Sequence, residues 1–125
     1  MRNCKIYVWG RLFSLDVIYD CYPGEEVLDC QKDAADRIIN ASESINAAKP
    51  KVEEYILHHN KAEVAEDSID NIFRYIIPKS LFVTRDEKNR TVAIMCNYKF
   101  DIEHGLDIVF INEKLTKIGP EDIIL

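Results

Sequence analysis

The sequence predicts an α+β fold, in which an antiparallel sheet packs against two to three helices. Segments that alternate apolar and polar residues stand at both ends of the chain, and segments with helical spacing lie between them. Short turn signals separate the alternating segments, as in hairpins. We therefore expect an N-terminal β-hairpin, a helical middle region and a C-terminal β-meander. At 125 residues the chain is expected to form a single domain over residues 1–125.

The first hairpin is predicted from strand-like residues on either side of Gly10 and Arg11. Glycine suits the first position of a two-residue hairpin loop because it tolerates positive φ. Pairing across this loop collects the apolar side chains on one face, as Val8 with Phe13, Ile6 with Leu15, and Cys4 with Val17. On the other face, Lys5 is expected opposite Asp16 as an ion pair.

The middle region has helical spacing from Val27 to Ile45, with acidic residues in its first turn. Pro50 is suited to open a second helix. The inward face of that helix would carry Val52, Tyr55, Ile56 and His59. Asp67 or Ser68 is suited to cap a third helix, which Pro78 would end. Its inward residues would be Ile69, Ile72, Phe73 and Ile76.

From Ser80 onward the period changes to two, which indicates strands. Turns at residues 86–89 and 101–105 set the expected registers. The predicted apolar pairs are Val83 with Val92, Leu81 with Ile94, Phe100 with Leu106, Tyr98 with Ile108, and Cys96 with Phe110. Lys99 is expected opposite Asp107 on the other face. A short strand over Leu115–Ile118 follows, and the apolar tail Ile123–Leu125 is expected to pack.

Charge and composition narrow the classes of function. The net charge is −6, and residues 24–60 hold four basic and eight acidic residues. This excess of acid argues against nucleic acid and against an anionic membrane, and it suits either solubility or a protein partner with a basic surface. No apolar run is long enough to span a membrane, and no signal segment precedes the first strand, so we expect a cytoplasmic protein. The four cysteines match no zinc pattern and are expected to be reduced.

The segment Asp101-Ile102-Glu103-His104-Gly105 is the main candidate for chemistry. Its acids and histidine could bind a metal or act as acid and base. In the structural interpretation, which we favour, Asp101 hydrogen-bonds its own loop and Gly105 supplies a conformation that other residues resist. The adjacent His58 and His59 are poorly placed to chelate one ion. No nucleotide loop, metal framework or nucleophile–base set is evident, so we predict no metal and no cofactor.

The outer face of the C-terminal sheet is the second candidate. It is expected to carry mostly apolar residues, namely Phe82, Ala93, Met95, Asn97, Val109 and Ile111. Either a helix or the C-terminal tail covers this face, or it binds a partner or a second copy. The candidate binding residues are therefore Asp101, Glu103 and His104 in the loop, together with Met95, Val109 and Ile111 on this face.

Three stretches resemble an uncharacterised bacterial domain family: the D-x-E-H-G segment 101–105, the ending Ile118–Leu125, and the strand-to-helix junction Tyr19–Gln31. Some relatives occur in toxin–immunity settings, so the resemblance implies a binding role and transfers no catalytic residue. A non-catalytic protein-binding domain, of immunity type and directed at a toxin, is the leading hypothesis. The alternatives are a small enzyme or metal-dependent domain using Asp101, Glu103 and His104, and a module that self-associates through the Met95–Ile111 face.

Overall fold

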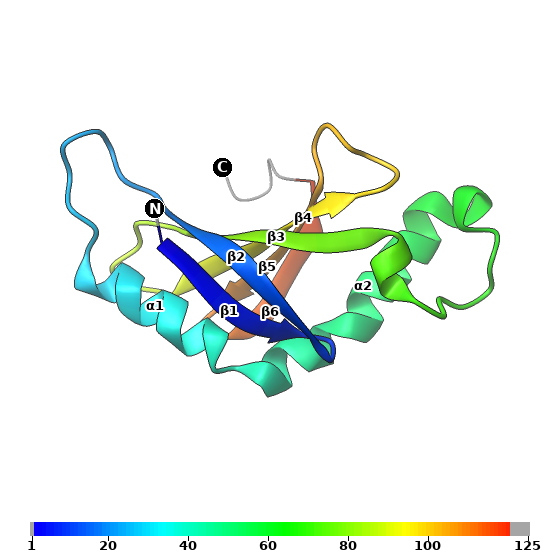
Figure 1. Ribbon diagram of the computed structural model, residues 1–125, viewed down its shortest axis with the longest axis horizontal. Coiled ribbons are helices and arrows are strands. Elements are labelled where there is room, and N and C mark those ends of the chain that lie inside the picture. Colours follow the sequence, from blue (N-terminus) through cyan, green and yellow to red (C-terminus); the bar gives the residue numbers. More distant parts are fainter. Residues whose placement is uncertain (1, 121–125) are drawn as a thin grey trace.

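The computed structural model describes residues 2–120, which form one six-stranded sheet with helices on one side (Figure 1). In chain order the elements are β1 (Arg2–Val8), β2 (Arg11–Tyr19), α1 (Asp29–Ile39), α2 (Ser42–Val64), the 3-10 helix η1 (Ile72–Arg74), β3 (Ile76–Val83), β4 (Thr91–Tyr98), β5 (Leu106–Ile111) and β6 (Lys114–Gly119). The strands lie in the sheet in the same order as in the sequence.

The predicted antiparallel sheet is wrong, because the sheet is mixed. β2 and β3 are parallel, with Val17 beside Leu81, and the other neighbours are antiparallel. The chain between β2 and β3 includes both helices, which carry it back across one face so that β3 starts at the same end as β2. Parallel neighbours need such a long crossover, whereas a hairpin turn always produces antiparallel ones.

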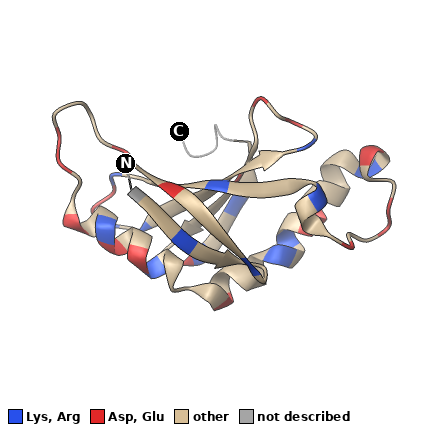
Figure 2. Ribbon diagram, in the orientation of Figure 1, with Lys and Arg blue, Asp and Glu red and all other residues tan. Residues whose placement is uncertain are grey.

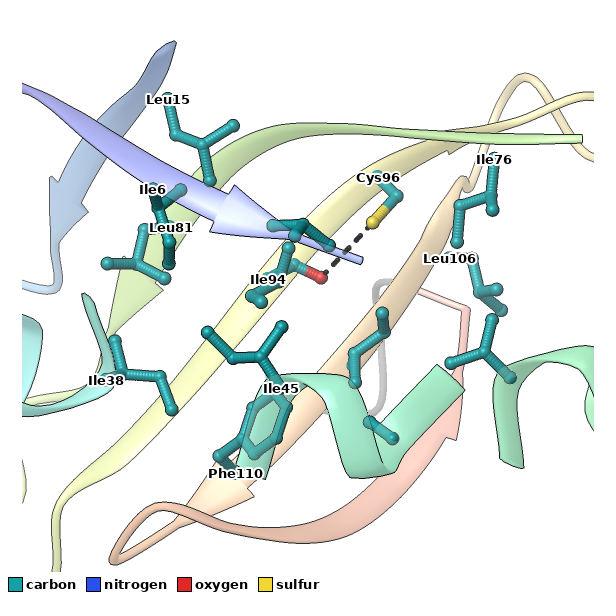
Figure 3. Close-up of a cluster of buried hydrophobic side chains, with 14 of the residues drawn as sticks. Ile6, Leu15, Ile38, Ile45, Ile76, Leu81, Ile94, Cys96, Leu106 and Phe110 are labelled. Atoms are coloured by element: carbon teal, nitrogen blue, oxygen red, sulfur yellow. Dashed lines mark hydrogen bonds between the residues drawn. The ribbon is translucent and has the colours of Figure 1, made fainter. Parts of the chain in front are cut away.

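The core lies between the helices and one face of the sheet, here called the inner face (Figure 3). Its fully buried members come from strands β1 to β5 and from both helices; they include Ile6, Leu15, Leu81, Ile94, Leu106, Phe110, Ile38 and Ile45. Cys4 and Cys96 are also buried, as predicted for cysteines that act as small apolar residues. The apolar residues of the alternating strand pattern thus face the helices, as expected.

In the helical middle region, the helices begin and end at other residues than predicted. Within residues 2–120 there are two α-helices: Asn40 ends α1, and Ile45 of the predicted first stripe belongs to α2. Pro50 does not open a helix but lies inside α2. Proline there removes one N–H and leaves a carbonyl one turn earlier without its helical donor. Pro50 is exposed, so water can bond to that carbonyl and the helix continues.

The predicted third helix is wrong. Only the short η1 forms there, capped by Asn71, whose side chain accepts a hydrogen bond from the N–H of Phe73 at 3.1 Å. Ile76 begins β3, and Pro78 lies inside that strand beside a bulge. β3 is flanked on both sides by β2 and β4, and this pairing outweighs the local helical spacing. Proline is tolerated at bulges because the ladder is already interrupted there.

Of the predicted registers, that of β3 and β4 is confirmed, with Leu81 beside Ile94 and Val83 beside Val92. The first hairpin is shifted by two residues, because its loop is Trp9-Gly10, with both residues at positive φ, and not Gly10-Arg11. Consequently Lys5 faces Ser14, and the predicted pairing of Lys5 with Asp16 is wrong.

A tertiary contact explains why the loop includes Trp9. The indole N–H of Trp9 donates to the carbonyl of Ile45 in α2 at 2.9 Å, and its ring lies 5.9 Å from that of Phe73. Positive φ is unfavourable for a residue with a side chain. The hydrogen bond and ring contact to distant elements offset that cost.

The hairpin of β4 and β5 is shifted by four residues. Cys96 faces Leu106 and Met95 faces Asp107, so the predicted pairing of Lys99 with Asp107 is wrong. β4 ends at Tyr98, and one residue further the N–H of Lys99 donates to the carbonyl of Tyr75 at 2.8 Å. Phe100 stacks on the ring of Tyr75 at 5.5 Å, outside the strand. The loop therefore spans residues 99–105.

Gln31 of α1 is a buried polar side chain that joins three elements. Its Nε2 donates to the carbonyl of Asp20 at 3.1 Å, and its Oε1 accepts from the N–H of Leu28 at 3.0 Å. The N–H of Asp20 in turn donates to the carbonyl of Val83 at 2.9 Å. The side-chain amide of Gln31 thus joins the start of α1 to the ends of the parallel strands.

The apolar tail Ile123–Leu125 was expected to pack, but it lies outside the residues that the structure describes.

Candidate functional site

The sheet face opposite the helices, here called the outer face, carries the predicted set of C-terminal residues. The register aligns Phe82, Ala93 and Val109 in one row, and Met95 faces Asp107 in the next. Met95 and Ile111 are half-buried, but Val109 is only 3% exposed. Met95 and Ile111 can therefore contact a partner, whereas Val109 offers little surface to one.

The outer face also extends over the N-terminal half of the sheet, which the sequence analysis did not single out. Four of its apolar side chains are exposed, namely Tyr7 at 61%, Leu12 at 47%, Ile77 at 39% and Ile18 at 37%. Tyr7 and Leu12 are paired across the first hairpin. The signal was present in the alternation, since these residues stand between the inward-facing ones, but only the pairing of β2 with β3 joins them to the C-terminal strands.

The outer face is basic although the chain as a whole is acidic. Lys5, Lys79, Lys114 and Lys117 project from its strands, with Asp16 and the buried Asp107 as its acidic members. Acidic residues gather instead on α1 and on the loop that precedes it (Figure 2). The two sides of the molecule therefore differ in charge.

The Asp101–Gly105 loop is held by the hydrogen bonds that its motif suggests. The Oδ1 atom of Asp101 accepts from the backbone N–H of His104 at 3.2 Å and lies 3.1 Å from the Nδ1 atom of His104. The N–H of Gly105 donates to the carbonyl of Asp101 at 2.8 Å. Gly105 has φ +67°, and an added Cβ would lie 2.5 Å from the carbonyl oxygen of Cys96. Aspartate and glycine are thus required here by the backbone.

The loop closes one side of a cavity of about 230 Å³ on the outer face. Three of the predicted site residues, Met95, Glu103 and His104, line it together, while Val109 and Ile111 do not. The remaining polar lining comes from Asn97, which was predicted on the outer face, and from three residues that the sequence analysis did not assign to a site, namely Lys79, Ser80 and Asp107. Asp107 was expected on the surface opposite Lys99, but it is 1% exposed.

Cys96 also lines this cavity, and its thiol is buried in the core on the inner face. Burial raises the pKa of Cys96 well above its ordinary value, and the nearby carboxylate of Asp107 raises it further. The thiol is therefore held in its protonated form, which is the inert form of cysteine. Among residues 2–120, no three His, Cys, Asp or Glu side chains are grouped so that they could hold a metal ion.

A second hollow, of about 360 Å³, lies between α2 and β6. The helix contributes Lys51, Glu54, Tyr55, His58 and His59, and the strand contributes Leu115, Thr116, Lys117 and Ile118. Both histidines are exposed, whereas one was expected at the core edge. His59 stacks on Tyr55 with ring centroids 3.9 Å apart, and burial raises the pKa of Tyr55, helped by the charge of Asp101.

These features define a small α+β domain whose mixed sheet has one helix-covered face and, over the described residues 2–120, one face without helices, which carries exposed apolar and basic side chains. Over residues 2–125 the chain matches the family described as "Domain of unknown function (DUF6985)", and it belongs to that family. No curated protein and no solved structure matches the chain significantly. Within the described residues, no helix has the length and apolar character needed to cross a bilayer.

Proposed function

We propose that the chain is a non-catalytic protein-binding domain that acts through the outer face. The observation that carries the proposal is the exposure of Tyr7, Leu12 and Ile77 on one open sheet face. Exposed apolar groups that share a surface favour association, because contact with a partner removes them from water. Tyrosine is especially suited to an interface, since its ring is apolar and its hydroxyl can keep a hydrogen bond.

The charge of the outer face supports a partner with an acidic surface. Lys5 and Lys79 lie on the same strands as Tyr7 and Ile77, and opposite charges on a partner would speed and orient association. A basic partner would instead favour the acidic α1 side. The specific form of the proposal is an immunity-type role, in which this domain binds a toxin in the bacterial cytoplasm and blocks it. Its support is the resemblance carried by the Asp101–Gly105 motif.

The proposal is tested by isolating the partner from native cells and measuring its binding to purified variants by calorimetry. Replacing both Tyr7 and Ile77 with serine should weaken binding by at least about tenfold, because it removes the exposed apolar anchors. Tyr22→Ser is the matched control, since Tyr22 is 78% exposed but lies in the loop before α1. Equal affinities for all three proteins would contradict the proposal.

Self-association through the same face is distinguished by sedimentation of the purified chain. A dimer that dissociates in the Tyr7→Ser/Ile77→Ser variant would make a second copy the partner. A monomer at all concentrations, together with binding to a cellular protein, supports the heterologous partner.

A small acid–base or metal-dependent site is the second candidate, and one contact favours it. The carboxylate of Asp101 holds the imidazole of His104 at the rim of the cavity that Glu103 also lines. A carboxylate that orients a histidine is a common arrangement for general acid–base chemistry. Thermal melts with added divalent metal test it. A metal-dependent rise in Tm that disappears in His104→Ala would favour this candidate over the binding role.

A further inference from the structure

The edge of the sheet at β6 is the starting point for a second interaction surface. In the part of the chain that the structure describes, β6 is the last strand of the sheet, and β5 is its neighbour on one side only. An edge strand has backbone N–H and C=O groups that can pair with an added strand. Proteins that bind extended peptides often use such an edge, and pockets beside it select the side chains.

A helix borders this edge. The hollow between α2 and β6 is lined on one side by the consecutive residues Leu115–Ile118 and on the other by Tyr55 and His58. Leu115 and Ile118 are half-buried and pack against the core, so the floor of the hollow is apolar. The hollow is thus a groove with one strand wall and one helix wall, and it runs along the edge of β6.

The charged groups of this groove are mainly basic. Lys51 and Lys117 line it, with Glu54 as the one acidic side chain among its lining residues. The Nζ atom of Lys51 lies 3.9 Å from the carboxylate of Glu54, and both side chains are largely exposed. An ion pair of this length and exposure is weak, so it leaves Lys51 able to meet another carboxylate.

We propose that the groove between α2 and β6 binds an extended, acidic segment of a protein partner. The segment adds a strand at β6, places apolar side chains against Tyr55, Leu115 and Ile118 on the helix side, and presents carboxylates on the opposite side to Lys117 at the edge of β6. Alternate residues of an added strand point to the same side, which suits a segment that alternates apolar and acidic residues. This surface is separate from the outer-face anchors Tyr7 and Ile77, so the inference goes beyond the proposed function.

The probe is a fluorescein-labelled heptapeptide of alternating valine and glutamate, and its valine–lysine counterpart is the charge control. Fluorescence anisotropy should show saturable binding of the glutamate peptide, at least about tenfold tighter than that of the lysine peptide. Lys117→Glu should abolish binding. Lys32→Glu is the matched control, because Lys32 is exposed on α1 and its replacement changes the net charge by the same amount.

Two further measurements separate strand addition from charge attraction alone. N-methylation of alternate peptide bonds on the pairing edge should abolish binding, because it removes the backbone donors. Amide NMR shifts on titration should change at Leu115–Ile118 and along the facing turns of α2. Shifts confined to other surfaces, unchanged binding after N-methylation, or no binding up to about 1 mM peptide would each overturn the proposal.

The variant Tyr7→Ser/Ile77→Ser keeps the two hypotheses apart. It should bind the glutamate peptide as tightly as the unmodified chain, since Tyr7 and Ile77 do not line the groove. Loss of peptide binding in this variant would contradict the groove assignment. A failure of the peptide to bind at all overturns the groove alone and leaves the outer-face proposal to its own test.

Discussion

Ile94 and Met95 are neighbours on β4, yet their side chains lie in different environments. Ile94 is fully buried on the inner face, between Leu81 and Ile108. Met95 is half-buried on the outer face, where it faces Asp107. Both residues are apolar, so their composition does not distinguish them. The helices α1 and α2 cover the inner face and not the outer one, so the inner face is the place for residues that stabilise the fold and the outer face the place for residues that could bind.

The comparison predicts unequal losses from truncating the two neighbours, and this is the largest expected effect. Ile94→Ala should lower the free energy of unfolding by about 2–5 kcal/mol, because it leaves a cavity beneath the helices. Met95→Ala should lower it by under about 1 kcal/mol, since part of that side chain already meets water. Chemical denaturation of both variants gives the difference. Equal losses would show that the two faces are packed alike.

Gly105 lies where the chain passes from the outer-face loop back into the sheet. Gly105→Ala should lower the free energy of unfolding by about 2–3 kcal/mol for two reasons. Alanine is strained at the positive φ of this position, and its Cβ would collide with the carbonyl oxygen of Cys96. Gly24→Ala is the matched control. Gly24 also has positive φ, at +86°, but has no atom within 4 Å of an added Cβ, so only the backbone strain remains, about 1 kcal/mol. Thermal or chemical unfolding separates the two, and identical losses would refute the steric argument.

Gln31 is a polar residue buried on the inner face. Replacing it tests whether the hydrogen bonds of its amide are what make this burial tolerable. Gln31→Met keeps the volume but removes the partners of Leu28 and Asp20, so it should cost about 1–3 kcal/mol. The neighbouring exposed change Lys32→Ala should cost under about 0.5 kcal/mol. A neutral or stabilising Gln31→Met would mean that the amide network contributes nothing to stability.

The buried thiol of Cys96 should make the stability of the fold depend on pH. Its pKa is raised in the fold, so the unfolded chain releases this proton at lower pH than the folded chain does. The stabilisation is complete below the ordinary thiol pKa of 9.0 and declines above it, by up to about 1.4 kcal/mol per pH unit. The cost of Cys96→Ala, measured under reducing conditions, should therefore shrink between pH 8 and pH 10. A constant cost would indicate that the thiol ionises equally in both states.

The smallest effect is expected on the outer face. Ile77→Ser should change the free energy of unfolding by about 0.5 kcal/mol or less, since 39% of its side chain is already exposed. Its effect on binding should be far larger than its effect on stability. A stability loss comparable to that of Ile94→Ala would show that Ile77 belongs to a packed core and would remove a main support of the binding proposal.

The registers show how far sequence patterns reach. The prediction for β3 and β4 is correct, whereas the first hairpin is shifted by two residues and the β4–β5 hairpin by four. Side chains alternate with a period of two, so shifts by two or four leave the same residues inward. Sorting apolar side chains therefore identifies the faces but does not identify the partners. Lys5 with Asp16 and Lys99 with Asp107 looked like independent support, and both pairings are wrong.

The candidate site was predictable in its local part only. The roles of Asp101 and Gly105 follow from residues within one loop, and the structure agrees with them. The cavity beside the loop also needs Lys79 and Ser80 of β3, which are distant in the sequence. The groove between α2 and β6 joins residues about sixty positions apart, and no local pattern predicts that contact.

The sequence by itself determined which strand residues face the core, the inward stripe of α1 from Gln31 to Ile38, and the local roles of Asp101 and Gly105 in their loop. These depend on local periodicity and on the preferences of single residues. Only the tertiary structure decided the parallel pairing of β2 with β3, the strand over Ile76–Val83 in place of a third helix, and the continuation of α2 through Pro50. Each depends on what lies beside the segment in space, because tertiary contacts can outweigh local propensities, which are worth about 1 kcal/mol or less for most residues and about 3 kcal/mol for a proline inside a helix.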